Sequence, residues 1–374
     1  MRILGIETSC DETGAAVLEG TDINQPVKLL SNSLATSLAS HAITGGIIPE
    51  NAAREQIKFI IPVIKESIQK AGLNFKRPEI DAIAVTYGPG LIGSLLVGVE
   101  TAKTLSMLWN IPIIPVNHLY GHIYANWITT DNIEHKVNSK NDKKPSALSL
   151  KPNTWIEFPA LALVVSGGHT DLVLIKNHGE LIVLGGTRDD AAGEAFDKIG
   201  RLLSLPYPAG PLISKLADKG DPKTYNLPRP MWDSKDYDFS FSGLKTSVLN
   251  LIKKNNWVFD NHLNVDKANE YGNSKLIVNL CASVQEAIID VLVFKTMKAV
   301  MEFEVKSLIL GGGVAANTAL RKEFQNRSSV KGVNLYVPSV KLCTDNGAMI
   351  ASAGFYNRNF KSWAEVTADP ELYY

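Results

Sequence analysis

A chain of 374 residues exceeds the usual size of one domain, so two lobes with substantial cores are expected. Hydrophobic residues make up 45% of the chain and charged residues 20%, which excludes a disordered or fibrous protein. The 38 basic and 38 acidic side chains give a formal net charge of +0, so binding to nucleic acid would require a local basic patch.

Cysteine usage and the N-terminal sequence indicate the cellular compartment. The three cysteines lie far apart and none belongs to a CxxC pair, so the sequence indicates neither a disulfide framework nor a thiolate zinc site. The N-terminus enters a strand pattern directly, without the pattern of a secretory signal peptide. No uninterrupted apolar run approaches the ~18 residues that span a bilayer. We therefore expect a cytoplasmic protein with no membrane partner.

Strands and helices alternate along the chain, and many strands run into a glycine-rich turn. In the first half we expect strands over residues 2–7, 14–19, 80–86 and 111–116, and helices over residues 50–71, 93–108 and 118–128. In the second half we expect strands over residues 160–165, 171–176, 181–185 and 307–310, and helices over residues 190–204, 243–255, 275–303, 315–327 and 345–358. This alternation predicts an α/β protein. Residues 129–157 are polar and show little periodicity, so we interpret them as a surface insertion.

Two histidines four residues apart lie in the sequence HLYGH, at His118 and His122. On a helix they project from one face, where two neutral imidazoles can share a metal if carboxylates or waters complete its shell. The alternative is a pair of half-buried polar side chains at a lobe boundary. A glutamate does not directly follow His118, so the pattern is not the HExxH motif of zinc proteases.

Glycine clusters follow two apolar strands, in the sequences VSGGH at 165–169 and LGGGV at 310–314. Such turns allow backbone N–H groups to approach phosphate oxygens closely, and a following helix adds a favourable dipole. Neither cluster matches the P-loop or the dinucleotide-binding pattern, and glycines also serve tight packing of strands against helices. Together with the acidic turn near the N-terminus, the two clusters predict a nucleotide site.

Acidic residues recur beside these turns. Asp189 and Asp190 precede a predicted helix and are interpreted as its caps. Glu194 and Asp197 share one face of that helix, which is typical of a solvated stripe and also compatible with a binding role.

Nine motifs in chain order together resemble one known family, the bacterial tRNA N6-threonylcarbamoyladenosine transferases called TsaD. They are GIETSCDET, GGIIPENAAR, TYGPGLIGSLLVG, NHLYGH, VVSGGHTDL, DDAAGEAFDKIGRLL, RPMWDSKDYDFSFSGLKT, GGGVAANTALR and CTDNGAMIA. The resemblance covers nearly the whole chain apart from residues 129–157 and the last dozen or so.

The resemblance implies an α/β, two-lobed, actin-like fold of the sugar-kinase and heat-shock-ATPase kind, with duplicated lobes. We expect residues 1–128 with 346–374 to form the N-terminal lobe and residues 129–345 the C-terminal lobe. His118, His122 and Asp345 are implied to bind one divalent metal ion per chain, Fe²⁺ or Zn²⁺.

The same resemblance implies a substrate site and partners. The residues implied to bind the acyl-adenylate are Val164, Val165, Ser166, Gly167, Gly168, Asp197, Gly210 and Asn317. The donor would be threonylcarbamoyl-AMP, the acceptor N6 of adenosine at tRNA position 37, and the product AMP. An inactive paralogue and a small P-loop ATPase are the implied protein partners.

Two positions depart from the family pattern. Gln56 stands where the family usually has a histidine, and Ala209 replaces the first glycine of the usual YPGG. Neither is one of the three implied metal ligands, although either could change an affinity.

Glu12 is our candidate for the catalytic base, because it lies in the acidic N-terminal turn. Three other functions are alternatives: an ATPase or sugar kinase, a metalloprotease, and a non-catalytic scaffold. A kinase offers no role for the HLYGH histidines, the protease lacks HExxH, and a scaffold would be expected to lose metal ligands.

Overall fold

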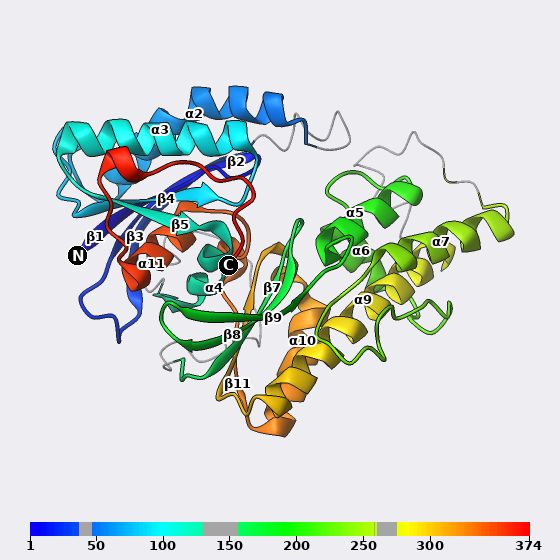
Figure 1. Cartoon of the computed structure of the whole chain (residues 1–374). Coiled ribbons are helices and arrows are strands. Elements are labelled where there is room, and N and C mark those ends of the chain that lie inside the picture. The colour runs from blue at the N-terminus through cyan, green and yellow to red at the C-terminus, as the bar shows by residue number, and fades with distance from the viewer. Residues whose placement is uncertain (37–46, 130–155, 258, 260–274) are drawn as a thin grey trace, which may run out of the picture. The chain divides into compact units, whose positions relative to one another are not determined.

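The computed structural model describes residues 1–36, 47–129, 156–257, 259 and 275–374 (Figure 1). The predicted surface insertion at 129–157 falls almost entirely outside these residues.

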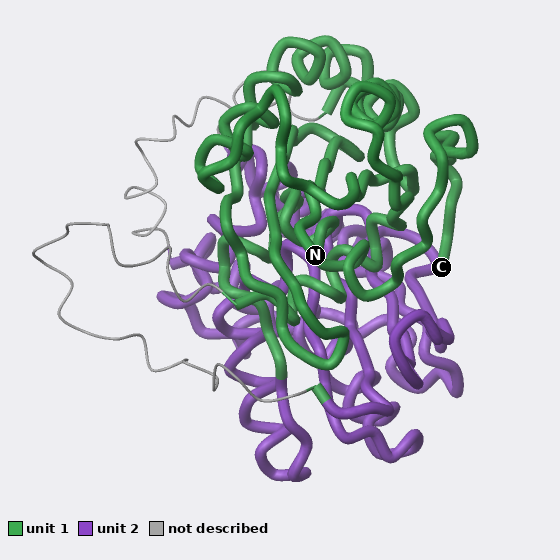
Figure 2. Tube along the Cα trace, turned by 90° about the vertical axis from the view of Figure 1, so that its left-hand side faces the viewer, with its two compact units in different colours: residues 1–39, 47–156, 336–374 green, residues 40–46, 157–335 purple. Residues whose placement is uncertain are grey.

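The chain folds into two compact units, each assembled around its own sheet. The first comprises residues 1–39, 47–156 and 336–374, and the second comprises residues 40–46 and 157–335 (Figure 2). The expected division into lobes at 128/129 and 345/346 stays a prediction. Asp345 belongs to the first unit, together with the histidine-bearing segment.

The first unit contains a six-stranded sheet in the order β5-β4-β1-β2-β3-β6. Its strands are β1 (Arg2–Glu7), β2 (Glu12–Glu19), β3 (Val27–Thr36), β4 (Ala82–Gly88), β5 (Ile113–Asn117) and β6 (Ile128–Thr129). Strands β1, β2 and β3 form an antiparallel meander, whereas β4 lies parallel to β1 and β5 lies parallel to β4. The carboxyl ends of β1, β4 and β5 therefore meet at one edge.

Helices cover both faces of this sheet (Figure 1). One face carries α2 (Pro49–Lys70) and α3 (Ile92–Trp109), and their apolar residues pack on Leu4 and Ile6 of β1. The other face carries α4 (His118–Tyr124) and α11 (Gly347–Asn357). Gly72 directly follows the C-cap of α2, Ala71, and has a φ of 77°, in the left-handed region that glycine adopts readily.

Glycine allows α11 to approach the sheet closely. A Cβ atom on Gly5 of β1 would lie 2.0 Å from the carbonyl oxygen of Gly347, and one on Gly347 would lie 2.6 Å from the backbone of Ala15. Gly121 of α4 has the same role against α11, since a Cβ there would lie 2.8 Å from Ile350 Cδ1. These contacts bring the start of α11 against α4.

The second unit repeats the strand order of the first. Its five-stranded sheet has the order β11-β10-β7-β8-β9, so the meander β7-β8-β9 corresponds to β1-β2-β3, and β10 lies parallel to β7 as β4 does to β1. The strands are β7 (Ala160–Val165), β8 (Thr170–Asn177), β9 (Glu180–Gly186), β10 (Ser307–Gly311) and β11 (Asn334–Tyr336).

The helices of the second unit surround the long helix α9. They are α5 (Ala192–Leu202), α6 (Gly210–Ala217), α7 (Ser242–Lys254), α9 (Lys275–Glu302) and α10 (Thr318–Lys331). By length and composition α9 could cross a membrane, but 83% of its most apolar window is buried inside the protein. It is therefore a core helix. Short 3₁₀ helices lie at Ala125–Trp127, Gly313–Ala316, Val340–Leu342 and Trp363–Glu365.

The predicted α/β fold with two related lobes is confirmed. Among the described residues, four helices and strands were not predicted from the sequence: β3, the short strand β6, the short helix α6 and the short strand β11. The helix expected over 118–128 ends earlier, at Tyr124, and continues as a 3₁₀ turn into β6.

Candidate metal centre and glycine turn

The helix α4 presents both histidines of HLYGH on one face. It begins directly after β5, where the side chain of Asn117 accepts a hydrogen bond from the backbone N–H of Leu119 at 2.8 Å and so caps the helix. The rings of His118 and His122 lie edge to face, with centroids 4.7 Å apart. The predicted helical arrangement of the pair is therefore present.

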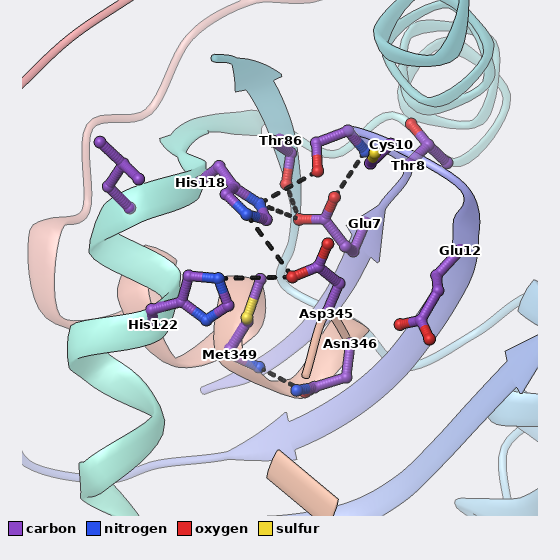
Figure 3. A network of polar contacts seen from close by, with 12 residues as sticks. Glu7, Thr8, Cys10, Glu12, Thr86, His118, His122, Asp345, Asn346 and Met349 are labelled. Atoms are coloured by element: carbon purple, nitrogen blue, oxygen red, sulfur yellow. Dashed lines mark hydrogen bonds and ion pairs between the residues drawn. The ribbon is translucent and has the colours of Figure 1, made fainter. Parts of the chain in front are cut away.

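Asp345 approaches both rings from the segment that precedes α11 (Figure 3). Its Oδ1 atom lies 3.5 Å from Nε2 of His118 and 3.3 Å from Nε2 of His122. The two imidazoles are 8% and 1% exposed, and the carboxylate is 23% exposed. One candidate ligand atom from each residue can be chosen so that all three lie within 4.8 Å of one another.

These distances fit a shared divalent ion. Metal–ligand bonds of about 2.1 Å place neighbouring ligand atoms about 3.0–3.4 Å apart in tetrahedral or octahedral geometry. In addition, both ring nitrogens of His122 are buried and make no hydrogen bond to the described residues. A buried nitrogen without a hydrogen bond is costly, and coordination to an ion would satisfy Nε2. The cluster is thus chemically suited to hold a metal.

A second layer of residues orients His118. Its Nδ1 atom lies 3.1 Å from Oε2 of Glu7 and 3.1 Å from the hydroxyl of Ser9. Glu7 is fully buried, and its carboxylate also accepts hydrogen bonds from the Thr86 hydroxyl at 2.6 Å and from the Ser9 N–H at 2.5 Å. With a cation bound, a hydrogen bond from Nδ1–H to Glu7 would leave the Nε2 lone pair for the ion that His118 shares with Asp345, which is the usual arrangement for a ligating histidine.

Negative charge dominates this cluster. Burial lowers the pKa of His118, but the carboxylates of Asp345 and Glu7 outweigh that effect and raise it to about 9. Burial, followed by the charges of Asp345, Asp11 and Glu7, raises the pKa of Glu12 to about 8. Both shifts have the sign expected of a site that favours a bound positive charge.

Glu12 lies near the three candidate ligands without bonding to them (Figure 3). It begins β2, and its Oε2 atom is buried without a hydrogen-bond partner among the described residues. No structural hydrogen bond to the described residues therefore occupies that oxygen. A group that exchanges a proton with substrate needs such an available oxygen.

The glycine turn of the second unit follows β7. Ser166 closes the turn by donating its N–H to the carbonyl of His169 at 2.8 Å, and its hydroxyl accepts a hydrogen bond from the His169 N–H. Gly167 and Gly168 are exposed, and a Cβ atom on either would meet nothing within 4 Å. These glycines are thus not required by packing within the described structure. Val164 and Val165 are fully buried in β7, so they can support the turn only from within the sheet.

The remaining residues implied by the resemblance lie in the second unit and have structural partners. Asp197 accepts hydrogen bonds from the N–H groups of Ala209, at 2.7 Å, and Gly210, at 3.3 Å, where α6 begins. Asn317 caps α10 by accepting the Leu320 N–H and donates to the side chain of Gln285 at 2.8 Å. A ligand role for these two side chains would have to be compatible with these bonds.

The predicted capping role of Asp189 and Asp190 is corrected by the structure. The helix α5 has Ala191 as its N-cap and no side-chain cap. Asp189 instead accepts the N–H groups of Phe241 and Ser242 and so caps the distant helix α7. Asp190 forms an ion pair with Lys198.

The structure also adds residues that the sequence analysis did not assign to the site. The sequence analysis gave no role to Glu7, Ser9 or Thr86. Their position at the carboxyl ends of β1 and β4, beside the start of α4, was the signal that could have identified them, because those ends share one edge of the sheet.

Comparison with known proteins places this site in a family. The structure itself defines an α/β protein with duplicated sheet topology and a buried His–His–Asp cluster. The family model for TsaD, described as tRNA N6-adenosine threonylcarbamoyltransferase, matches residues 28–136 and 146–352.

Curated relatives match over the full length. A protein of Bacillus subtilis (strain 168) named tRNA N6-adenosine threonylcarbamoyltransferase is 46% identical over 100% of this chain and 95% of its own. One of the same name from Thermosipho africanus (strain TCF52B) is 44% identical over 100% of this chain and 99% of its own. The chain therefore belongs to the TsaD family.

Among solved structures, YeaZ from Pseudomonas aeruginosa is 14% identical to this chain. The match covers 49% of this chain and 63% of the other, with a TM-score of 0.28.

Proposed function

We propose that the chain transfers the threonylcarbamoyl group of threonylcarbamoyl-AMP to N6 of the adenosine at tRNA position 37, next to the anticodon, and releases AMP. Membership in the TsaD family supports the class of reaction. The observation that carries the proposal for this chain is the buried cluster of His118, His122 and Asp345, whose spacing suits one divalent ion.

The three residues would hold one ion per chain, which we propose to be Fe²⁺ or Zn²⁺. Such an ion, when bound, supplies Lewis-acid polarisation of a substrate oxygen. The chain's own contribution is orientation: Glu7 fixes the ring of His118, and the close contact of Gly121 with α11 keeps both histidines beside Asp345.

Glu12 is the proposed proton acceptor. The N6 nitrogen forms a bond to the threonylcarbamoyl carbonyl carbon, and the bond from that carbon to the phosphate oxygen breaks, so its electron pair leaves with AMP. The proton lost from N6 passes to the Glu12 carboxylate. A base must be ionised to act, and a cation bound by Asp345 and the histidines would lower the raised pKa of Glu12 toward that state.

The glycine turn of the second unit is the proposed site for the AMP part of the donor. The backbone N–H groups of Gly167 and Gly168 would hold its phosphate or carbonyl oxygens, while Ser166 closes the turn and Val164 and Val165 anchor it in β7. The open space beside both glycines supports close approach by a ligand. Asp197, Gly210 and Asn317 are proposed to contact the sugar and adenine.

We also propose the setting in which the reaction takes place. The enzyme would act in the cytoplasm, with no membrane, together with an inactive paralogue and a small P-loop ATPase.

The direct test is mass spectrometry of tRNA nucleosides after incubation with the protein, its partners, threonine, bicarbonate and ATP. A parallel reaction receives preformed threonylcarbamoyl-AMP, which separates the transfer from synthesis of the donor. The expected products are N6-threonylcarbamoyladenosine at position 37 and an equal amount of AMP. Replacing His118 by alanine should reduce both to background.

A matched variant controls for loss of any histidine. His178 packs its ring against Phe158 in the second unit, so His178→Ala should keep wild-type product formation. Full product from the His118→Ala protein, or from protein stripped of metal, would contradict the proposal. Rapid ATP hydrolysis by the chain alone, without modified tRNA, would point instead to a kinase-like activity.

A further inference from the structure

The side chain of Gln56 reaches from α2 to the turn that joins β1 and β2. Its Nε2 atom lies 2.9 Å from the carbonyl oxygen of Glu12, 3.2 Å from that of Cys10 and 3.3 Å from that of Thr8. One amide group thus donates toward three backbone carbonyls of a single turn, which we call the N-terminal turn (residues 8–12).

The helix α3 holds the same turn from its first residues. The N–H of Leu91 donates to the carbonyl of Ser9 at 2.8 Å, and the hydroxyl of Ser94 donates to the carbonyl of Cys10 at 2.9 Å. Backbone carbonyls along the N-terminal turn are therefore bound by α2 and α3. The Ser9 side chain and the preceding Glu7 both contact His118.

The orientation of the Gln56 amide is set by this environment. Gln56 is 1% exposed, and its Oε1 atom is buried without a hydrogen-bond partner among the described residues. Rotating the amide by 180° would place that oxygen against three carbonyl oxygens, so only the NH₂ group can face the turn. A buried oxygen without a partner is costly and requires an explanation. The three contacts made by Nε2 provide one.

We propose that Gln56 is a positioning residue of the metal centre, acting through the N-terminal turn. The amide of Gln56 fixes the backbone of the turn, and the Ser9 N–H then holds the Glu7 carboxylate at 2.5 Å. Glu7 and the Ser9 hydroxyl together orient the His118 ring through Nδ1. This inference rests on the metal site of the proposed function. It adds Gln56 to that site, although the Gln56 amide donates to the N-terminal turn and not to the three ligands.

The first test replaces Gln56 by methionine, which keeps the length of the side chain and removes its donor. Affinity for Zn²⁺ alone is measured in competition with a coloured chelator. Loss of an outer-layer partner typically weakens metal binding 10–100-fold, and because Gln56 acts through the turn we expect about a 10-fold rise in the Kd for Zn²⁺. Turnover with saturating metal should recover, which separates positioning from a direct role in catalysis. Gln325→Met, on α10 of the second unit, should leave the Kd unchanged.

A second pair of variants keeps the test decisive if Gln56→Met fails to fold. Ser94 and Ser106 are both buried on α3, and each donates its hydroxyl to a backbone carbonyl outside the helix. Ser94 holds Cys10 of the N-terminal turn, whereas Ser106 holds Ile111 at the other end. Ser94→Ala should raise the Kd for Zn²⁺ about 3-fold, and Ser106→Ala should not change it.

The outcomes separate this inference from the proposed function. A wild-type chain that binds neither Zn²⁺ nor, in a parallel anaerobic titration, Fe²⁺ would overturn both. A wild-type chain that binds Zn²⁺, with Gln56→Met and Ser94→Ala binding it equally tightly, would overturn only the role of Gln56. The role of Gln56 would also be overturned if Ser106→Ala raised the Kd for Zn²⁺ as much as Ser94→Ala does. The loss of affinity would then come from a general loss of stability.

Discussion

The two units share a strand order but carry different groups at the same positions. In both units, the first strand of an antiparallel meander, β1 or β7, ends at a turn. Its neighbour on the side away from the meander, β4 or β10, runs parallel to it. In the first unit, that turn follows Glu7 and leads to Glu12. In the second, the corresponding turn is Ser166 to His169, with two exposed glycines at its centre.

In the function that we propose, this difference lets one backbone arrangement serve two kinds of ligand. Carboxylates and imidazoles concentrate negative charge and lone pairs, which suits a cation. A turn without side chains exposes N–H groups, which suits phosphate or carbonyl oxygens. The comparison makes separate predictions for the two units, because we propose that side chains carry the chemistry in the first and that the backbone carries it in the second.

The largest effect is expected from Glu12→Gln, which removes the proposed base and keeps the shape of the side chain. General-base catalysis typically contributes 10²–10⁴-fold, so the single-turnover rate with donor bound should fall by about 1000-fold. The rate of the wild-type enzyme should rise with pH through the pKa of Glu12, because the ionised form is active, and this rise should be absent in the variant. A rapid-quench assay of tRNA modification measures both.

The control for this variant is Glu19→Gln, at the other end of β2, where the carboxylate is partly exposed and pairs with Arg2. It should keep the wild-type rate. A Glu12→Gln protein with an unchanged single-turnover rate would exclude Glu12 as the base.

Sequence analysis predicted the parts of the first unit that depend on local spacing. The helical spacing of His118 and His122 was enough to place both rings on one face. Asp345 is far away in the sequence, and only the resemblance to a family could join it to them. The role of Glu7 depends on the edge shared by β1, β4 and β5, which no local pattern reveals.

Buried polar residues explain why sequence analysis missed β3. In β3 the inward positions include Ser31 and Ser33, so the apolar alternation that predicts a strand is interrupted. The hydroxyl of Ser31 lies 2.8 Å from that of Ser67 on α2, a tertiary contact that makes a serine acceptable there. Asp189 was misassigned for a similar reason, because it caps α7 instead of the helix that follows it.

A smaller effect, on stability, is expected from Gly5→Ala in the first unit. The added Cβ would lie 2.0 Å from the Gly347 carbonyl oxygen and 2.6 Å from the Ala351 nitrogen, and these backbone atoms cannot move without shifting α11. Overpacking of this kind typically costs 1–3 kcal/mol, so the free energy of opening β1 should fall by about 3 kcal/mol. Native-state hydrogen exchange of the β1 amides measures it.

The control for Gly5→Ala is Gly313→Ala in the second unit, where a Cβ would meet nothing within 4 Å. Its hydrogen exchange should match that of the wild type. Equal protection of β1 in the Gly5→Ala protein would show that α11 does not depend on this close approach to the sheet.

The smallest effect, and the one most specific to the second unit, is expected from Gly168→Ala. A Cβ at this position has open space, so the free energy of unfolding should change by less than about 0.5 kcal/mol, as for surface substitutions generally. A methyl group would nevertheless stand where a ligand oxygen must approach the backbone N–H groups. We therefore expect the Kd for AMP, measured by calorimetry, to rise about 10-fold, equivalent to about 1.4 kcal/mol, while the Kd for Zn²⁺ stays the same. Weaker Zn²⁺ binding with unchanged AMP binding would reverse the assignment of cation and anion chemistry to the two turns.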